Sequence, residues 1–150
     1  MFLDFKISDF NISGEAIPEH VADVILEHHI TPMQDVSDCM VVSVSPSIKS
    51  SYRSLKWEKE HGRSGSSQHC FGEKEDGTFD KDAKGATDWK CDNFIELKDE
   101  LLKLIIDHTN YTRLCIYNTF IHCDFKKTSS GERQLFKINN GRWKFIKNID

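Results

Sequence analysis

The sequence lacks the features that would place the chain in a membrane or in an export pathway. No run of apolar residues approaches the roughly 20 that a membrane-spanning helix needs. Residues 1–6 do not form a basic stretch followed by an apolar core, so we expect no signal peptide. We therefore predict no membrane insertion and synthesis in a cytoplasm.

Cysteine pairs and excess positive charge are also missing. The 5 cysteines are odd in number and contain no C-x-x-C spacing. This usage is typical of reduced thiols and excludes a disulfide framework or a cysteine-ligated zinc cluster. The formal net charge of -4 argues against a general nucleic-acid binder, and the basic residues within 126–147 are interpreted as solvated side chains. We predict no nucleic-acid partner.

The chain is long enough to form one domain with its own core. Its 150 residues are 38% hydrophobic, 29% charged and 11% aromatic, as in ordinary globular proteins. It contains neither an internal repeat nor a low-complexity linker. We predict a single domain over residues 1–150 that is a monomer.

Helical periodicity marks three stretches of the sequence. The predicted helices are residues 17–31, 54–61 and 93–108, with residues 33–39 as a candidate second helical piece after the first. Pro18 suits the first turn of the first helix, and Pro32 is expected to close or interrupt it. Ser54 is a suitable N-cap for the second helix.

Short β-branched or alternating segments predict strands. The predicted strands are residues 40–44, 47–49, 87–91, 114–117, 120–125, 134–138 and 142–146. Asn139-Asn140-Gly141 joins the last two segments and is typical of a hairpin turn. We predict an α+β fold, with a small antiparallel sheet flanked by helices and a metal site on its central strands.

Three short stretches carry good metal ligands among small or apolar residues. They are Ser67-Gln68-His69, Gly85-Ala86-Thr87-Asp88 and Phe120-Ile121-His122-Cys123-Asp124. A carboxylate in apolar surroundings, such as Asp88, must be paired or metal-bound. Two histidines and one carboxylate form a common ligand set of catalytic zinc, because a fourth position stays open for water. If the stretches meet in space, they form the centre of a metallohydrolase.

His122 and Asp124 lie two residues apart, so both face the same side of the predicted strand. Either both coordinate a metal, or Asp124 holds the histidine in place. A buried histidine paired with a neighbouring aspartate is the simpler interpretation. The remaining histidines lie on predicted helices or at their ends and are interpreted as surface residues: His20, His28, His29, His61 and His108.

Arg53 stands between a predicted strand and a predicted helix. A guanidinium group there can hold a substrate carboxylate through two parallel hydrogen bonds, and a surface arginine is the alternative. The acidic segment 76–82 lacks the alternating acids, the central glycine and the final glutamate of a calcium loop. We therefore predict no calcium site.

Together these residues resemble the M15 peptidases, the zinc D-Ala-D-Ala carboxypeptidases and L,D-endopeptidases that include many phage endolysins. The resemblance covers roughly residues 17–125 and consists of three ordered blocks. The blocks are Ser50-Ser51-Tyr52-Arg53-Ser54 followed by Ser67-Gln68-His69, then Lys84-Gly85-Ala86-Thr87-Asp88, and then Phe120-Ile121-His122-Cys123-Asp124.

The resemblance implies an M15 or hedgehog-like peptidase fold and a zinc ion (Zn2+). It assigns the zinc ligands to His69, Asp88 and His122. It gives Arg53 a catalytic place near the substrate's carboxylate or the developing oxyanion. It also implies that the substrate is bound by Arg53, Tyr52 and Ser67.

Two departures from the family pattern matter. The family has only a few residues between the first histidine and the aspartate, so two alignments compete. Asp76 stands at that short distance, whereas Asp88 has the better flanking residues and is preferred, with 73–84 as an insertion. Some branches carry an acid three residues before the last histidine, where Thr119 stands here. Asp124 is the remaining acid near that histidine and is the predicted catalytic acid-base residue.

The resemblance therefore implies a metallopeptidase that hydrolyses peptide bonds of bacterial peptidoglycan, in the stem peptide or at D-Ala-D-Ala. We expect a phage lysis enzyme or a virion-associated enzyme, made in the host cytoplasm and acting on the cell wall after release. The alternative is a non-catalytic zinc-binding module of the same fold that binds a peptide or serves as a structural virion protein.

Overall fold

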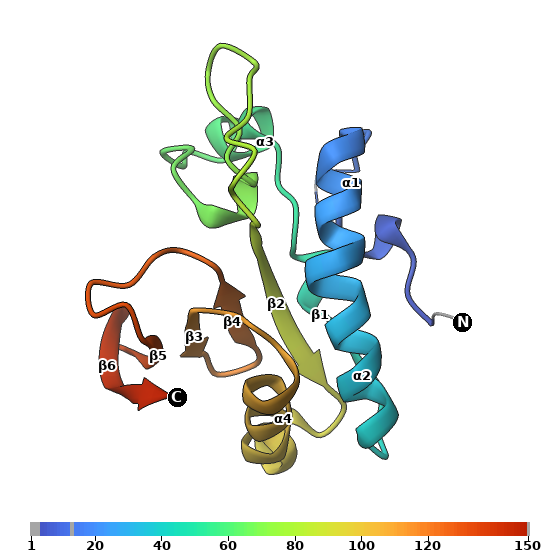
Figure 1. Cartoon of the computed structure of the whole chain (residues 1–150), viewed down its shortest axis with the longest axis vertical. Coiled ribbons are helices and arrows are strands. Elements are labelled where there is room, and N and C mark those ends of the chain that lie inside the picture. The colour runs from blue at the N-terminus through green and yellow to red at the C-terminus, as the bar shows by residue number, and fades with distance from the viewer. Residues whose placement is uncertain (1–3, 13, 150) are drawn as a thin grey trace.

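The computed structural model describes residues 4–12 and 14–149 of the chain (Figure 1). The α-helices are α1 (Glu19–Ile25), α2 (Thr31–Cys39), α3 (Leu55–Glu60) and α4 (Phe94–His108). Shorter helical turns are η1 (Ile7–Phe10), η2 (Leu26–Ile30), η3 (Ser47–Lys49) and η4 (Gln68–Cys70). The strands are β1 (Val44–Pro46), β2 (Ala86–Cys91), β3 (Arg113–Ile116), β4 (Ile121–Asp124), β5 (Arg133–Asn139) and β6 (Arg142–Ile149).

The strands form one 6-stranded sheet in the order β1-β2-β4-β3-β5-β6. The predicted α+β class is confirmed. The prediction of an antiparallel sheet was wrong at one place, because β3 and β5 are parallel while the other neighbours are antiparallel. β4 ends at Asp124, opposite the first residue of β3. β5 begins beside that same end of β3, so β3 and β5 run in the same direction.

Residues 33–39 are helical, as predicted, but the expected break at Pro32 is absent, because helical backbone runs from Glu19 to Cys39. A π-helical turn, η2, joins α1 to α2, and the N–H of Thr31 donates to the carbonyl of Leu26, five residues earlier. Pro32 occupies one of the first two positions of α2. The wider turn just before the proline accommodates its missing N–H and its ring, which would break a regular α-helix.

Two predicted strands were misplaced. The strand expected over 40–44 begins at Val44, because Val41 is 95% exposed and has no partner surface to cover it. Residues 47–49 form a helical turn in which Ile48 has a left-handed backbone with φ 48. A β-branched residue therefore predicts a strand only where the sheet supplies packing.

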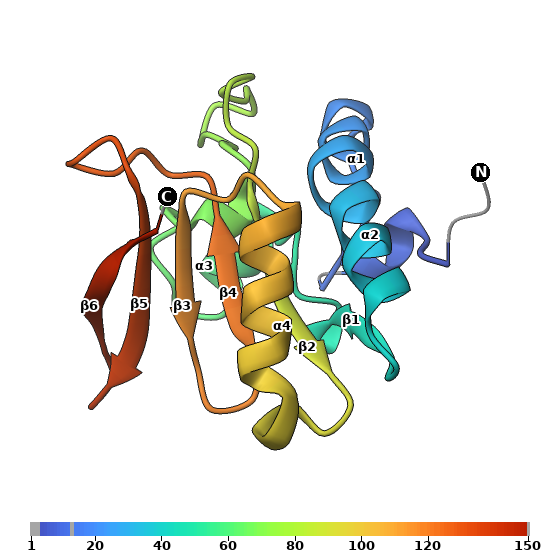
Figure 2. The same cartoon turned by 60° about the horizontal axis from the view of Figure 1, so that its bottom comes forward.

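The other predicted elements are confirmed with small shifts of their ends. Ser54 caps α3, and its Oγ accepts the Trp57 N–H at 3.0 Å. The β5–β6 hairpin turns at Asn140 and Gly141, which both have positive φ, as a two-residue hairpin turn requires. Figure 2 shows α4 across one face of the sheet and α3 behind the opposite face.

The core lies between the sheet and the helices α1, α2 and α4. Trp89 and Ile121 are opposite each other on β2 and β4, and both are fully buried. They belong to the same buried cluster as Leu101 and Ile105 of α4. Alternation along the strands leaves the other face of the sheet to polar and charged side chains. Within the described residues, no helix combines the length and the apolar character needed to cross a bilayer.

The prediction that His29 lies on the surface was wrong. Its side chain is fully buried. Its ring nitrogens lie 2.7 Å from the hydroxyl of Tyr111 and 2.7 Å from the carbonyl of Lys84. Burial lowers the pKa of His29 to about 3, so the ring is neutral. Its Nδ1 also lies 2.8 Å from the Oγ1 of Thr87, which joins the helical layer to β2.

Gly85 tests how tightly the chain packs just before β2. Gly85 has φ +74, and a Cβ there would lie 2.3 Å from the ring of Phe71. We expect Gly85→Ala to destabilise the protein by about 2–4 kcal/mol, because backbone strain and overpacking add. Gly77→Ala is the matched control, since Gly77 also has a positive φ, +84. A Cβ added at Gly77 would have no atom within 4 Å among the described residues.

The control should lose only about 1 kcal/mol. Urea unfolding of the metal-free protein under reducing conditions measures both free energies of unfolding. Equal losses of unfolding free energy in the two variants would contradict the predicted clash between a Cβ at position 85 and the Phe71 ring.

Candidate metal centre

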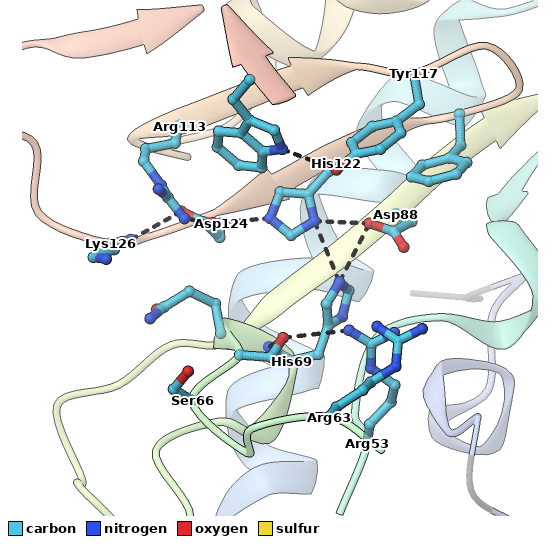
Figure 3. A pocket seen from close by; sticks show the side chains of 14 residues that line it. Arg53, Arg63, Ser66, His69, Asp88, Arg113, Tyr117, His122, Asp124 and Lys126 are labelled. Carbon is cyan, nitrogen blue, oxygen red and sulfur yellow. Dashed lines mark hydrogen bonds and ion pairs between the residues drawn. The ribbon is translucent and has the colours of Figure 1, made fainter. Parts of the chain in front are cut away.

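Strand register brings the predicted ligands of two strands together. Asp88 on β2 is directly opposite His122 on β4. On the other side of β4, Arg113 of β3 is opposite Asp124. Residues opposite each other share a face, so these side chains all project from the face that α4 leaves uncovered (Figure 3).

The third predicted ligand, His69, comes from the turn η4. The Oγ of Ser67 accepts the His69 N–H at 3.1 Å and starts this turn. The backbone N–H of Arg53 donates to the His69 carbonyl at 2.9 Å, and the N–H of Asp88 donates to the Ser50 carbonyl at 2.8 Å. The segment 50–53 therefore links η4 to β2 and brings His69 onto the sheet.

The three predicted ligands meet in the structure (Figure 3). His69 Nε2 lies 3.2 Å from His122 Nδ1 and 3.3 Å from Asp88 Oδ1. His122 Nδ1 lies 2.9 Å from Asp88 Oδ1. Ligand atoms bound at about 2.0–2.1 Å in a tetrahedral zinc site lie roughly 3.3 Å apart, so this donor set fits zinc.

Hydrogen bonds on the outer side orient both rings so that one nitrogen of each faces the centre. His69 Nδ1–H donates to the Ser51 carbonyl at 2.7 Å, which leaves Nε2 unprotonated. His122 Nε2–H donates to Asp124 Oδ2 at 2.8 Å, which leaves Nδ1 for the centre. Three atoms that can accept a proton or bind a cation therefore face one another, and such an arrangement needs a shared positive charge.

The charges at the centre follow from burial and from these neighbours. Burial lowers the pKa of His69, so this ring is neutral. Burial raises the pKa of Asp88, but both histidines outweigh it and hold the pKa well below its usual range. Burial also lowers the pKa of His122, yet the hydrogen bonds to Asp124 and Asp88 raise it to about 9. In the metal-free protein one proton on His122 therefore supplies the positive charge.

Asp124 is placed behind His122 and not at the centre. Its carboxylate accepts two bonds from Arg113, Nε to Oδ1 at 2.9 Å and Nη2 to Oδ2 at 2.5 Å. The side chain is fully buried. Burial raises the pKa of Asp124, but the hydrogen bonds from His122 and Arg113 bring it down to about 2. The geometry favours the alternative in which Asp124 holds the histidine, and it offers no support for a proton-transferring role.

The terminal hairpin completes this side of the centre. The Trp143 ring lies 4.6 Å from the guanidinium carbon of Arg113 and 5.3 Å from the His122 ring. Its Nε1–H donates to the Tyr117 hydroxyl at 2.8 Å. Trp143 therefore packs against the pair that orients His122.

A cavity of about 430 Å³ opens over the three predicted ligands. Besides these ligands, it is lined by Arg53, Arg63, Ser66, Ser67, Gln68, Arg113, Tyr117, Phe120, Asp124, Lys126 and Trp143. Arg53 and Ser67 thus lie where the sequence placed substrate-binding residues, and the Arg53 Nη2–H donates to the Ser67 Oγ at 3.3 Å. The centre is therefore reachable by a ligand.

Two other predicted positions lie away from the cavity. Tyr52 was predicted to bind substrate, but it is 2% exposed and its hydroxyl donates to Glu73 at 3.0 Å. This prediction was wrong because the side chain packs in the core against Phe71. Asp76, the competing ligand, holds Thr78 in an exposed turn, so the structure favours Asp88 as the carboxylate of the centre.

Sequence reasoning missed several residues around the centre. Arg113, Tyr117 and Trp143 are separated from one another in sequence and carry no motif. Arg63 stands in a loop of small residues that reads as flexible. Only the alternation of β3 and β6 relative to β4 could have indicated that Arg113 and Trp143 share a face with His122.

Comparisons with known proteins add no relatives. No protein-family model matches the chain, and neither a curated protein nor a solved structure is significantly similar to it.

The protonation of His122 provides a prediction about the metal-free protein. At pH 7 both ring nitrogens should carry protons, and the ring should titrate near pH 9, above its ordinary value of 6.5. Because the folded pKa exceeds the unfolded one, the associated stability is complete below pH 6.5 and is lost as the pH rises through about 9. Histidine ¹H–¹⁵N correlation spectra check this. Adding zinc should remove the Nδ1 proton at pH 7. A His122 ring that titrates near 6.5 would contradict the predicted effect of Asp88 and Asp124 on its pKa.

Arg113 and Asp124 provide a second prediction. Asp124→Asn or Arg113→Gln should weaken zinc binding roughly 10- to 100-fold, because His122 loses its fixed orientation. Competition with a zinc chelator measures the dissociation constants. Arg142→Gln is the control, since Arg142 is an exposed arginine of β6 outside the cavity. Unchanged affinity in both Asp124→Asn and Arg113→Gln would show that the pair does not position the ligand.

Proposed function

We propose that the chain is a zinc-dependent peptidase that hydrolyses peptide bonds of bacterial peptidoglycan. The convergence of His69 Nε2, Asp88 Oδ1 and His122 Nδ1 within 2.9–3.3 Å carries this proposal. Two histidines and one carboxylate match a catalytic zinc, which keeps a position open for water. The cavity above these atoms gives a substrate access to that position.

The substrate class is drawn from the resemblance to the M15 peptidases. The ordered blocks around Arg53, His69, Asp88 and His122 contribute to one site in space, as such a family requires. On this basis we also propose the M15 or hedgehog-like fold, a stem-peptide or D-Ala-D-Ala bond as the target, and a phage lysis or virion-associated setting.

The chain's own residues would prepare the site for hydrolysis. When bound, zinc supplies a Lewis acid that acidifies water and polarises a carbonyl. The Ser51 carbonyl and Asp124 hold the two imidazole rings, and the Ser50 hydroxyl donates to Asp88 Oδ2 at 2.9 Å. These contacts preorganise the ligands and reduce the reorganisation that binding would otherwise require.

Tyr117 would act on the substrate directly, and Arg53 would act through its charge. The Tyr117 hydroxyl accepts a hydrogen bond from Trp143, so its own proton is left to donate to an oxygen in the cavity. Burial raises the pKa of Tyr117, so the hydroxyl stays protonated at neutral pH. This hydroxyl is a donor of the type that stabilises a developing oxyanion, and the positive charge of Arg53 in the cavity wall adds to that stabilisation.

One observation favours the second candidate, a non-catalytic zinc-binding module. The carboxylates among the described cavity-lining residues are Asp88 and Asp124, and both are already bonded to histidine. Thr119, at the position where some M15 branches carry an acid, lies outside the lining. A site without a free general base suits binding of a peptide or a structural role in a virion.

Metal analysis and digestion of purified peptidoglycan separate the two candidates. We expect one zinc per chain and the release of new amines, detected by mass spectrometry, from at least one wall chemotype. Asp88→Ala should lose both, because it removes a ligand. Asp76→Ala should keep both, because Asp76 lies in the exposed turn.

A zinc-loaded protein that releases no amines from any chemotype would favour the binding module. Retention of zinc and activity by Asp88→Ala, with their loss in Asp76→Ala, would reverse the choice of carboxylate ligand.

A further inference from the structure

Positive charge gathers in the cavity, although the chain as a whole is acidic. The net charge is -4, yet the cations that line the cavity are Arg53, Arg63, Arg113 and Lys126. The acids of the lining are Asp88 and Asp124, which are already paired. A cavity with unmatched positive charge favours an anionic ligand.

Two of these arginines are committed to the protein itself. Arg113 gives two hydrogen bonds to Asp124 and packs on Trp143. Arg53 is 8% exposed, and its Nη2–H donates to Ser67. Neither group can turn fully toward a ligand without breaking contacts that hold the centre together.

A single buried glutamate, Glu58, lies between Arg53 and Arg63. Its Oε2 is 3.5 Å from Arg53 Nε and 3.6 Å from Arg63 Nε, beyond ordinary hydrogen-bond length. Among the residues that the structure describes, neither Glu58 Oε2 nor Arg53 Nε has a hydrogen-bond partner. One carboxylate therefore faces two guanidinium groups, and one positive charge remains unbalanced.

Arg63 is the accessible member of this cluster. Its side chain is 52% exposed, whereas that of Arg53 is 10% exposed. The Arg63 N–H donates to the Glu58 carbonyl at 2.8 Å, and the guanidinium lies 5.6 Å from the centre of the Trp57 ring. In Figure 3 Arg63 stands beside Arg53, on the His69 side of the centre. The group is thus held at the cavity with donors still exposed.

We propose that Arg63 binds a free carboxylate of the peptide substrate, so that the site prefers substrates with a chain end near the bond to be cut. The inference rests on the proposed peptidase function and narrows its substrate class. A guanidinium group presents paired N–H donors that match both oxygens of a carboxylate. Arg53, which contacts Ser67 and Glu58, stays in the wall of the cavity.

Two matched peptides test this inference on the zinc-loaded full chain. One is a stem-peptide analogue that ends in a free D-alanine carboxylate, and the other is the same peptide with a C-terminal amide. Stopped-flow tryptophan fluorescence measures binding before turnover, since Trp143 lines the cavity and Trp57 packs on Arg63. The ratio of kcat/KM for the two peptides is measured in parallel.

We expect the acid to bind roughly tenfold more tightly than the amide, or better. Arg63→Gln should bring this ratio near one, and Arg63→Lys should keep only part of it, because lysine lacks the paired donors. Arg142→Gln should leave the ratio unchanged. Thermal unfolding of each variant confirms that the fold is intact.

Equal affinity for acid and amide in the unmodified chain, or an undiminished preference in Arg63→Gln, would overturn the assignment. Acid-selective binding without cleavage would keep the Arg63 assignment and reject the peptidase function. Cleavage without any preference for the acid would keep the peptidase function and reject the Arg63 assignment.

Discussion

The placement of His122 between two buried carboxylates is the constraint on which the rest of the site depends. Asp88 lies on the inner side of the ring and Asp124 on the outer side. Two buried negative charges beside one imidazole need compensation, which the His122 proton and Arg113 supply in the metal-free protein. Strand register makes the arrangement possible, because β4 carries both His122 and Asp124 between β2 and β3.

The same constraint explains why the surrounding elements converge on this face of the sheet. His69 reaches the centre only because segment 50–53 bonds both to η4 and to β2. Trp143 from the terminal hairpin covers the guanidinium group that neutralises Asp124. The opposite face packs in the hydrophobic core, so the polar face is free to carry buried charge. The fold thus buries apolar side chains on one side of the sheet and charged side chains on the other.

Much of the fold was predictable from the sequence, and the errors of the prediction have identifiable physical causes. The helix over 93–108 and the terminal hairpin follow from strong periodicity and from turn residues such as Gly141. Val41 and Ile48 misled the strand prediction, because β-branched residues favour strands only where a neighbouring strand packs on them. The helical pieces on both sides of Pro32 were predicted, but the break between them is absent, because a π-helical turn accommodates the proline. His29 and Tyr52 are buried through partners more than 20 residues away in sequence, which no local pattern indicates.

The sequence by itself determined the ligand types at His69, Asp88 and His122, because the chemistry of imidazole and carboxylate does not depend on the fold. It also determined that His122 and Asp124 share one strand face, since alternation is a property of the backbone. Only the tertiary structure decided that Asp88 and not Asp76 lies with the two histidines, and that Asp124 bonds to the outer nitrogen of the His122 ring. It also decided that Arg63 is the exposed arginine of a pair that shares one glutamate. These outcomes depend on distances between segments far apart in the chain, which packing and strand register set.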